Sequence, residues 1–515
     1  MLARGLLLLF CTALVLLPSW LRADWDGTEG RRVQIALEML RYDSWMVPLL
    51  GGAPTWAKPP LHYWLLMLCE RAFGDGYMWL RLPSVLGAWG SAWLAGELLR
   101  SRFGGSVGWL GAFGILCSPL VVFAWPTAEI DPLFASLVGA SLWLLATGAA
   151  DGRRTLVLWS GLVGGLAFLQ KGPPYFLFAA GAYLVWLRHR RMRHGLWHFV
   201  PLMLVVLAYY VPLWSWHVDA GEMLRVANEE SVGRIATFRL KHVLATPGFW
   251  LRAIGVLCPF GLWCLWEWRG ERDARMGARD LVLRACSGGA VLAVAVLTLF
   301  PGRPTRYLLP NVMLFTVAVA PAVGHFFRHR APVPGFAQWL LRLVGLLGGV
   351  GLLVLPFVPR AGAAALGLAL VAALAPFWAT TPRRVVLASL LLPVLASWTI
   401  GLERSLRWSF GKRARVFAGQ LLRREIDRLG AAPDLGSLGH IDSSVLLASG
   451  LWPKGDERSR RLPETRWMLH EETDWLPVVA PDHVVRMRFR TPFKVFVLRE
   501  RRDSGAVRDV EGAGK

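Results

Sequence analysis

Two carboxylates and a lysine lie in a polar loop that directly follows the first apolar segment. Asp26 and Glu29 are three residues apart, and Lys58 precedes a Pro-Pro turn. Residues three apart share one side of a helix, so both carboxylates can face one reaction partner. A carboxylate can act as a general base, and a cation can stabilise a departing phosphate. The loop therefore suits chemistry on a lipid-borne phosphate, unless its acids only cap the amphipathic helix expected over 31–40.

A further acidic group lies at the start of a later apolar segment, in AEIDPLFA. Asp131 is the stronger candidate there and Glu129 the weaker, because an ionisable group at the membrane edge favours a functional site. We expect Asp131 either to organise the carboxylates of the first loop or to bind the acceptor. The alternative is that Asp131 only caps the helix before Pro132.

Basic residues near predicted helix ends could surround a phosphate. A lysine supplies a point charge and an arginine a bidentate fork, and both suit a phosphodiester that becomes a monoester. Tyr307 follows Arg306 directly and can hydrogen-bond beside it. The alternative is that they only extend to the membrane interface. The candidates are Lys58, Lys171, Arg303 and Arg306.

The other residues with metal-binding chemistry give a weaker signal. The six cysteines lie in or beside apolar segments and lack zinc-ligand spacing. His242 in the loop VANEESVGRIATFRLKHVLATPGFW could ligate a divalent metal, although a lone loop histidine is more often solvated. A metal requirement stays open.

The elements that position these residues are predicted to be membrane-spanning helices. The chain is 55% hydrophobic with a mean hydropathy of +0.43, and nothing in it alternates as a barrel strand would. We expect an all-α polytopic membrane bundle with about 13 spans of about 17 residues or more. They are placed at 5–22, 77–98, 104–123, 130–150, 155–170, 172–187, 196–216, 249–268, 281–300, 308–327, 336–357, 362–380 and 385–402.

The arginines predict the orientation of these spans, because Lys and Arg are retained on the cytoplasmic side. They gather in alternate loops, as in the run at 188–194 and the segment 269–279. The opposite loops are then extracytoplasmic, namely 23–76, 119–130, 219–248, 301–307 and the chain after 402. The net charge of +22 is therefore mostly topological, which argues against nucleic-acid binding.

The composition changes after residue 402, where charges become dense and apolar runs become short. The segment GKRARVFAGQLLRREIDRLG predicts an amphipathic helix. Short apolar runs at 443–447, 476–480, 484–487 and 493–498 predict strands. We therefore expect a transmembrane domain over 1–402, a small soluble α/β domain over 403–505 on the extracytoplasmic side, and a disordered tail over 506–515.

Four sequence motifs resemble those of the GT-C glycosyltransferases, in the bacterial branch related to lipid A aminoarabinose transferases and protein O-mannosyltransferases. They are TEGRRVQIALEML with SWMVPLLGGAPTWAKPPLHYW, then TAEIDPLFA, LQKGP and GRPTRYLLP. The resemblance covers roughly residues 5–402 by helix order and loop polarity. Two positions depart from the family pattern. Thr28 replaces the first of a paired Asp-Glu, and Ala57 replaces a glutamate that joins a histidine at a metal.

The resemblance implies an enzyme of the bacterial inner membrane that moves a sugar from a polyprenyl-phosphate donor to an extracytoplasmic acceptor. The acceptor is lipid A, another glycan or a protein. The implied catalytic residues are Glu29, Asp26 and Asp131. The rival hypothesis is a transporter or flippase of a lipid-linked saccharide, which should carry polar residues at the bilayer midplane. This chain instead gathers its charges in loops on one side.

Overall fold

The protein was analysed as a computed structural model, which describes most of the chain up to residue 328 and four strands near the C-terminus. The described residues are 2–20, 28–74, 76–187, 195–215, 281–298, 305–328, 435–438, 467–471, 483–490 and 495–501, with short stretches at 221, 225–226, 248–250, 253, 346, 394–395, 423–424 and 428. The chain divides into two compact units. One comprises residues 1–22 with 56–405, and the other residues 23–55 with 406–515.

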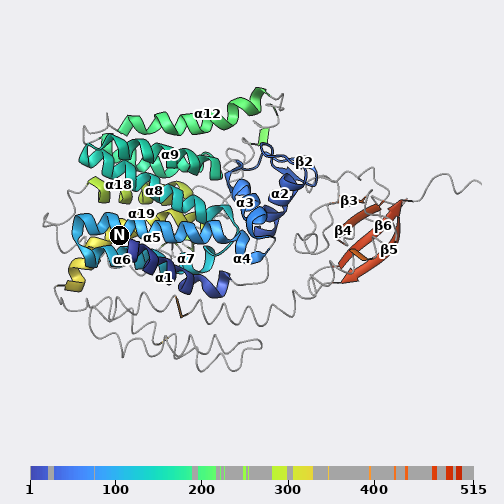
Figure 1. Ribbon diagram of the computed structural model, residues 1–515, viewed down its shortest axis with the longest axis horizontal. Coiled ribbons are helices and arrows are strands. Elements are labelled where there is room, and N and C mark those ends of the chain that lie inside the picture. The colour runs from blue at the N-terminus through green and yellow to red at the C-terminus, as the bar shows by residue number, and fades with distance from the viewer. Residues whose placement is uncertain are drawn as a thin grey trace, which may run out of the picture. The chain divides into compact units, whose positions relative to one another are not determined.

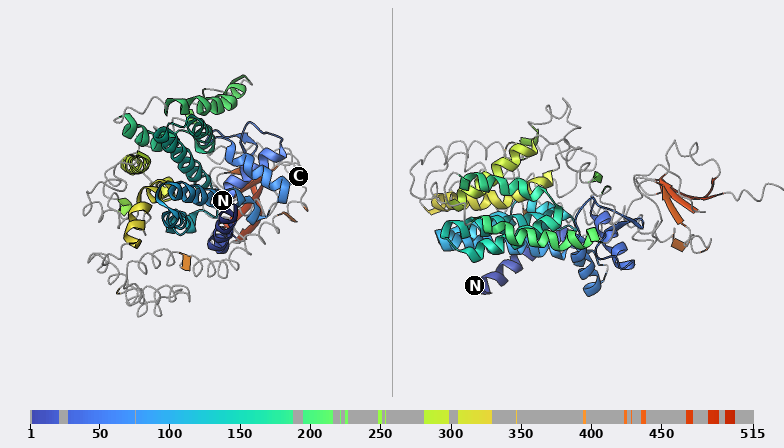
Figure 2. Two further views of the ribbon diagram at one scale, coloured as in Figure 1. Left: turned by 60° about the vertical axis from the view of Figure 1, so that its left-hand side comes forward. Right: turned by 90° about the horizontal axis from the view of Figure 1, so that it is seen from above.

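The first unit is a bundle of helices that run along a common direction (Figures 1 and 2). Helices α3 and α4 lie at one end of this bundle (Figure 1). The elements are α1 (Leu2–Trp20), α3 (Leu61–Phe73), α4 (Tyr77–Leu80), α5 (Leu82–Phe103), α6 (Gly105–Leu116), α7 (Pro119–Ala124), α8 (Ile130–Asp151), α9 (Arg154–Lys171), α10 (Pro174–Leu187), η1 (Leu196–His198), α12 (Phe199–Ser215), α18 (Leu281–Leu297), η3 (Thr305–Leu308) and α19 (Leu309–Arg328).

Three helices among the described residues are long and apolar enough to cross a membrane. They are Ile130–Asp151, Leu196–Trp214 and Thr305–Gly324. Shorter apolar helices accompany them at Leu2–Leu17, Gly105–Leu116, Pro174–Val185 and Leu281–Leu297. The chain is a multi-pass membrane protein that is mainly helical. The expected spans at 336–357, 362–380 and 385–402, and most of 249–268, lie outside the described residues, so the count of about 13 stays a prediction.

Two of the expected spans are broken into shorter helices at prolines. The span predicted over 104–123 is divided between α6 and α7, where Ser118 is extended (φ −62°, ψ 133°) before Pro119. Proline disfavours helical geometry in the residue before it and has no amide hydrogen to donate. The span predicted over 77–98 is likewise divided between α4 and α5, shortly before Pro83.

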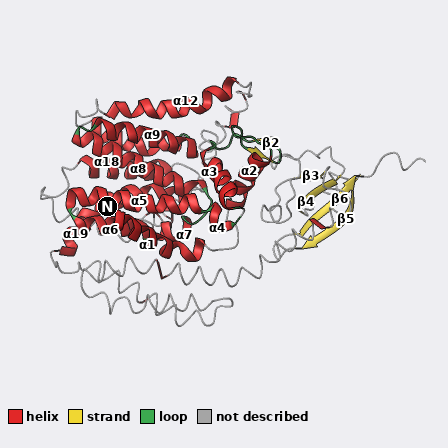
Figure 3. Ribbon diagram, viewed as in Figure 1, coloured by secondary structure: helices red, strands yellow, loops and turns green. Residues whose placement is uncertain are grey.

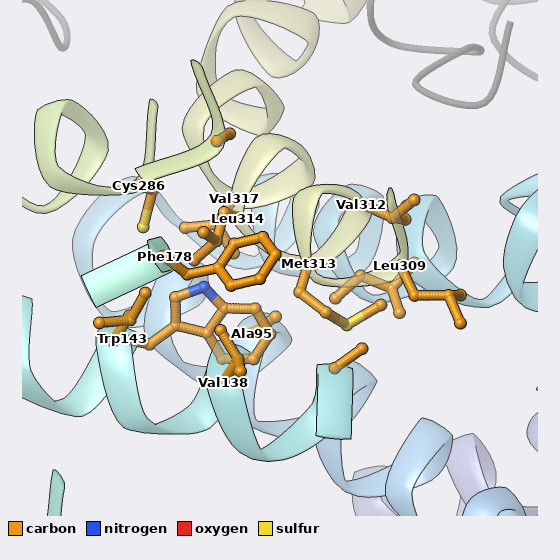
Figure 4. Close-up of a cluster of buried hydrophobic side chains, with 14 of the residues drawn as sticks. Ala95, Val138, Trp143, Phe178, Cys286, Leu309, Val312, Met313, Leu314 and Val317 are labelled. Carbon is orange, nitrogen blue, oxygen red and sulfur yellow. The ribbon is translucent and has the colours of Figure 1, made fainter. Parts of the chain in front are cut away.

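The core of the bundle is closely packed around large side chains. Trp143 of α8 lies among Phe178 of α10, Met313 of α19 and Cys286 of α18 (Figure 4). Small residues let the helices approach, as is common within membranes. A Cβ on Gly181 of α10 would lie 2.5 Å from the carbonyl oxygen of Gly288 in α18. Substitution there would force these two helices apart.

The second unit contains helix α2 (Glu29–Arg41) and a short hairpin of β1 (Leu49–Leu50) and β2 (Ala53–Pro54). The amphipathic helix expected over 31–40 is thus confirmed. The hairpin turns at Gly51 and Gly52, whose positive φ angles of 65° and 76° suit a two-residue turn. Glu38 ties the hairpin to α2, because its carboxylate accepts hydrogen bonds from Gln34 Nε2 at 2.9 Å and from the Gly52 amide at 3.0 Å.

The C-terminal part of the second unit contains a four-stranded sheet in the order β3-β4-β6-β5 (Figure 3). Its strands are β3 (Leu435–Leu438), β4 (Trp467–Glu471), β5 (His483–Arg490) and β6 (Val495–Arg501). β3 pairs with β4 in parallel, and the other pairs are antiparallel. The strands expected at 484–487 and 493–498 are confirmed, while β3 and β4 were not expected. The runs at 443–447 and 476–480 and most of the amphipathic helix over 411–430 lie outside the described residues.

Candidate functional site

Acidic and basic side chains meet in the first unit where α8 begins and α9 ends. Lys171 forms an ion pair with Asp131 Oδ1. Arg306 Nε lies 3.1 Å from Asp131 Oδ2, and its Nη1 lies 3.4 Å from Glu129 Oε1. Asp131 is therefore held between two cations, and Arg306 bridges two carboxylates. Four charged groups from three distant segments of the chain form one cluster.

The connection between α8 and α9 explains why Asp131 and Lys171 meet. The two helices have 22 and 18 residues and are joined by a tight turn at Gly152, which has the left-handed conformation (φ 71°). Such a short connection makes the helices antiparallel neighbours, so the start of α8 lies beside the end of α9. Asp131 then lies at the positive end of one helix dipole and Lys171 at the negative end of another, and both placements are favourable.

Aromatic rings complete the surroundings of Lys171. Its Nζ lies 4.3 Å from the ring centroid of Tyr307 and 5.1 Å from that of Phe134. Both distances are within the range of a cation–π interaction. Tyr307 follows Arg306 in η3, so this one short element supplies both the second cation and a ring that contacts the first.

Burial differs sharply within the cluster. The side chains of Asp131, Glu129 and Lys171 are only 8%, 10% and 12% exposed, whereas that of Arg306 is 35% exposed. Arg306 is thus the member of the cluster most accessible to a ligand. Asp131 carries two ion pairs while its side chain is almost fully buried.

The turn that carries Lys58 packs close to this cluster. A Cβ on Gly172, directly after Lys171, would lie 3.8 Å from Pro59 Cγ. Gly172 has a φ of +88°, which terminates α9 and turns the chain. The Lys58-Pro59-Pro60 turn therefore lies against the end of α9 that presents Lys171.

A buried hydrogen-bond network lies beside the cluster. His62 Nε2 lies 2.8 Å from the Ala128 carbonyl oxygen, and His62 Nδ1 lies 3.0 Å from Gln170 Nε2. Gln170 Nε2 also donates to the Ile130 carbonyl oxygen at 3.2 Å. His62 and Gln170 were not predicted from the sequence, and neither was the pairing of Glu129 with Arg306. The available signal was the presence of polar residues inside apolar segments, next to Lys171 and close to Lys58.

The remaining predicted site residues lie either in the second unit or outside the described residues. Glu29 is buried in the first turn of α2 and belongs to the second unit, so it is described apart from the cluster. Its position suits both the catalytic and the helix-stabilising interpretation. Asp26, Arg303 and His242 lie outside the described residues. Among the residues that are described, no group of three His, Cys, Asp or Glu side chains could hold a metal ion.

Comparisons with known proteins find similarity in sequence and in fold. The family of dolichyl-phosphate-mannose-protein mannosyltransferases matches residues 57–216, which include Lys58, Asp131 and Lys171. The chain is 28% identical over 361 residues to the undecaprenyl phosphate-α-4-amino-4-deoxy-L-arabinose arabinosyl transferase of Edwardsiella ictaluri, a match over 66% of this chain and 62% of that protein. The similarly named protein of Pseudomonas savastanoi pv. phaseolicola is 26% identical over 359 residues, which is 64% of each chain.

The match spans less than two thirds of the length of these relatives. The fold is similar over almost the whole chain to the crystal structure of ArnT from Cupriavidus metallidurans bound to undecaprenyl phosphate. The TM-score is 0.71 with 17% sequence identity, over 96% of this chain and 97% of that one. The chain therefore has a fold similar to that of this ArnT structure. The resemblance to aminoarabinose transferases and protein mannosyltransferases noted in the sequence is confirmed.

Proposed function

We propose that the protein is a membrane glycosyltransferase that moves a sugar from a polyprenyl-phosphate donor to an extracytoplasmic acceptor. The observation that carries this proposal is the coincidence of two independent findings. The relatives are named as undecaprenyl phosphate-α-4-amino-4-deoxy-L-arabinose arabinosyl transferases. The segment matched by the mannosyltransferase family holds a buried lysine and aspartate, and the accessible Arg306 from a later segment lies beside them. Cations of this kind suit a lipid phosphate.

The proposed reaction breaks the bond between the sugar's anomeric carbon and the phosphate oxygen. The bonding electrons remain on the phosphate, which changes from a diester to a monoester and gains negative charge. Preorganised cations stabilise such a developing charge more strongly than they stabilise the starting diester. In this proposal Arg306, Lys171 and Lys58 supply those charges, and Arg303 and Tyr307 assist from the segment that contains η3.

The carboxylates have separate roles in this proposal. Asp131 organises Lys171 and Arg306, a role favoured by its two ion pairs and its burial. The base that accepts the proton of the acceptor hydroxyl or amine is Glu29 or Asp26, in the first loop.

The finer organisation also belongs to this proposal. The chain has about 13 spans and lies in a bacterial inner membrane, with the cation cluster and an α/β domain over 403–505 on the periplasmic side. A reporter that is active only in the periplasm tests this topology. It should work when fused after residue 402 and fail when fused after Arg191. The reverse pattern would place the cluster on the cytoplasmic side and contradict the proposal.

The function is tested with purified protein in detergent. The first donor to offer is the aminoarabinose lipid in the names of the relatives, radiolabelled in its sugar, together with an envelope extract as the source of acceptors. The expected result is release of undecaprenyl phosphate without a sealed membrane. In sealed vesicles a flippase would instead move the intact donor across the bilayer, and that outcome would overturn the transferase proposal. Mass spectrometry of envelope glycolipids and glycoproteins from a deletion strain would identify the acceptor.

A further inference from the structure

His62 and Gln170 form a buried bridge between three segments of the first unit. Both side chains are fully buried. His62 lies on α3, Gln170 lies in the last turn of α9, and the carbonyl groups that they contact belong to Ala128 and Ile130. The bridge therefore joins α3, the end of α9 and the segment that leads into α8.

The hydrogen-bond partners determine where the protons lie. A carbonyl oxygen can only accept, so His62 Nε2, at 2.8 Å from Ala128 O, must carry the proton. A neutral imidazole with its proton on Nε2 has a free lone pair on Nδ1, which accepts from Gln170 Nε2 at 3.0 Å. The second amide hydrogen of Gln170 serves Ile130 O. All three interactions are satisfied by one tautomer of His62 and one orientation of Gln170.

Each member of this bridge is close in sequence to a charged residue of the candidate site. Gln170 immediately precedes Lys171, while Ala128 and Ile130 flank Glu129 and lead directly to Asp131. His62 is the second residue of α3, which follows the Lys58-Pro59-Pro60 turn. The bridge thus fixes the backbone from which the two carboxylates and the cations Lys58 and Lys171 extend.

The alternative to a role at the site is that this buried polar network only stabilises the fold. A network of that type exists elsewhere in the same bundle. His198 Nδ1 lies 2.8 Å from Ser160 Oγ, and His198 Nε2 lies 2.9 Å from the Tyr175 hydroxyl, which in turn lies 2.8 Å from Ser141 Oγ. Of these residues Tyr175 follows Lys171 by four positions, and the other three are more than ten residues away from Lys171.

The two networks differ in what they connect. The main-chain carbonyl groups that the His198 network binds are those of Val157 and Ser160, within α9, whereas the His62 network holds the carbonyl groups on either side of Glu129. The Gln170 side chain also leaves its Oε1 buried without a partner among the residues that are described. A buried acceptor without a partner is costly, so the orientation of this amide is maintained by its two donated hydrogen bonds.

We propose that His62 and Gln170 are positioning residues for the glycosyl transfer, which set Asp131 and Lys58 relative to Lys171. This inference rests on the proposed function. Neither residue contacts the sugar or the phosphate in this proposal, and both act through the backbone that carries the charged groups. Catalysis is sensitive to such placement, because a shift of about 1 Å can lower a rate by about 100-fold.

The test uses His62→Phe and Gln170→Met, which keep much of the side-chain volume and remove the hydrogen bonds. His198→Phe is the matched control, because it also removes a fully buried histidine with two hydrogen-bonded nitrogens from the same bundle. For each purified variant, kcat and KM for the labelled donor are measured together with the thermal unfolding temperature. The two positioning variants should lose about 10- to 100-fold in kcat, while the control keeps the kcat of the wild type.

A rescue variant separates positioning from simple stability. A glutamine at position 62 retains an amide donor for Ala128 O and an acceptor for Gln170, so His62→Gln should recover at least part of the kcat that His62→Phe loses. The inference is overturned if His62→Phe and Gln170→Met turn over like the wild type. It is also overturned if His198→Phe loses kcat to the same extent at an equal loss of unfolding temperature. A wild-type protein that never releases undecaprenyl phosphate from the donor overturns the proposed function itself, which is a different result.

Discussion

Removal of the Lys171 ammonium group separates the structural role of the ion pair from its catalytic role. Lys171→Met keeps an unbranched side chain of similar length but leaves Asp131, which is 8% exposed, with Arg306 as its remaining ion-pair partner. Breaking a buried ion pair on one side costs about 3–5 kcal/mol of folding free energy. Because Arg306 still lies 3.1 Å from the other oxygen, we expect a smaller loss of folding free energy, about 1–3 kcal/mol.

The catalytic loss should exceed what the stability loss explains. Loss of one charged hydrogen bond to the departing phosphate is worth about 1.5–3 kcal/mol, which corresponds to about a 10- to 150-fold decrease in kcat/KM. The decisive variant is Lys171→Met combined with Asp131→Asn. Removing both charges leaves no unpaired ion, so the unfolding temperature should return towards that of the wild type while kcat/KM stays low.

The assay therefore combines thermal unfolding in detergent with release of undecaprenyl phosphate from a labelled donor. Arg102→Met serves as the control, because it breaks an ion pair with Asp151 (2.7 Å) whose partners are 20% and 42% exposed. That change should cost at most about 1 kcal/mol and leave turnover intact. The reasoning is refuted if the double variant regains both stability and turnover, since Lys171 would then matter only as a partner for Asp131.

Three further predictions concern the base, the second cation and the packing of the bundle. Glu29→Gln and Asp26→Asn should leave folding intact while at least one lowers turnover by about 100-fold or more, as loss of a general base does; wild-type rates in both and in their combination would remove them from the mechanism. Arg306→Ala should weaken binding of undecaprenyl phosphate by about 1.5–3 kcal/mol, measured by titration in detergent, and unchanged affinity would exclude Arg306 from the phosphate site. Gly181→Ala should destabilise the protein by about 1–3 kcal/mol because its Cβ would meet the backbone of α18 at 2.5 Å. Gly90→Ala, which meets nothing within 4 Å, should not, and equal unfolding temperatures for the two would contradict this packing.

The sequence predicted individual members of the candidate site better than their arrangement. Asp131, Lys171 and Arg306 stand out because charged residues at the ends of apolar segments are costly to retain without a role. The short turn between α8 and α9 also implied that these helices are antiparallel neighbours, which brings Asp131 close to Lys171. The approach of Arg306 could not be predicted in this way, because it depends on how a segment more than a hundred residues later packs against them.

Features that depend on uncharged side chains or on local backbone were harder to predict. His62 and Gln170 carry no charge in the network, and each sits in a segment whose apolar pattern is otherwise continuous. The Gly51-Gly52 hairpin had a usable signal, since paired glycines suit a two-residue turn. Pro83 and Pro119 were sequence signals for the helix breaks before α5 and α7. Hydropathy averaged over a whole span obscures both signals.

The central claim is that the sugar leaves its lipid phosphate on this protein, and a count of both products tests it most directly. Purified wild-type protein in detergent is given donor labelled in the sugar and separately in the lipid, with the acceptor extract in excess. The account predicts one undecaprenyl phosphate for each labelled acceptor molecule, and a much slower appearance of both products with Lys171→Met. The account would be contradicted if the labelled sugar stayed on its lipid in every sample while the intact donor crossed the bilayer of sealed vesicles that contain the protein.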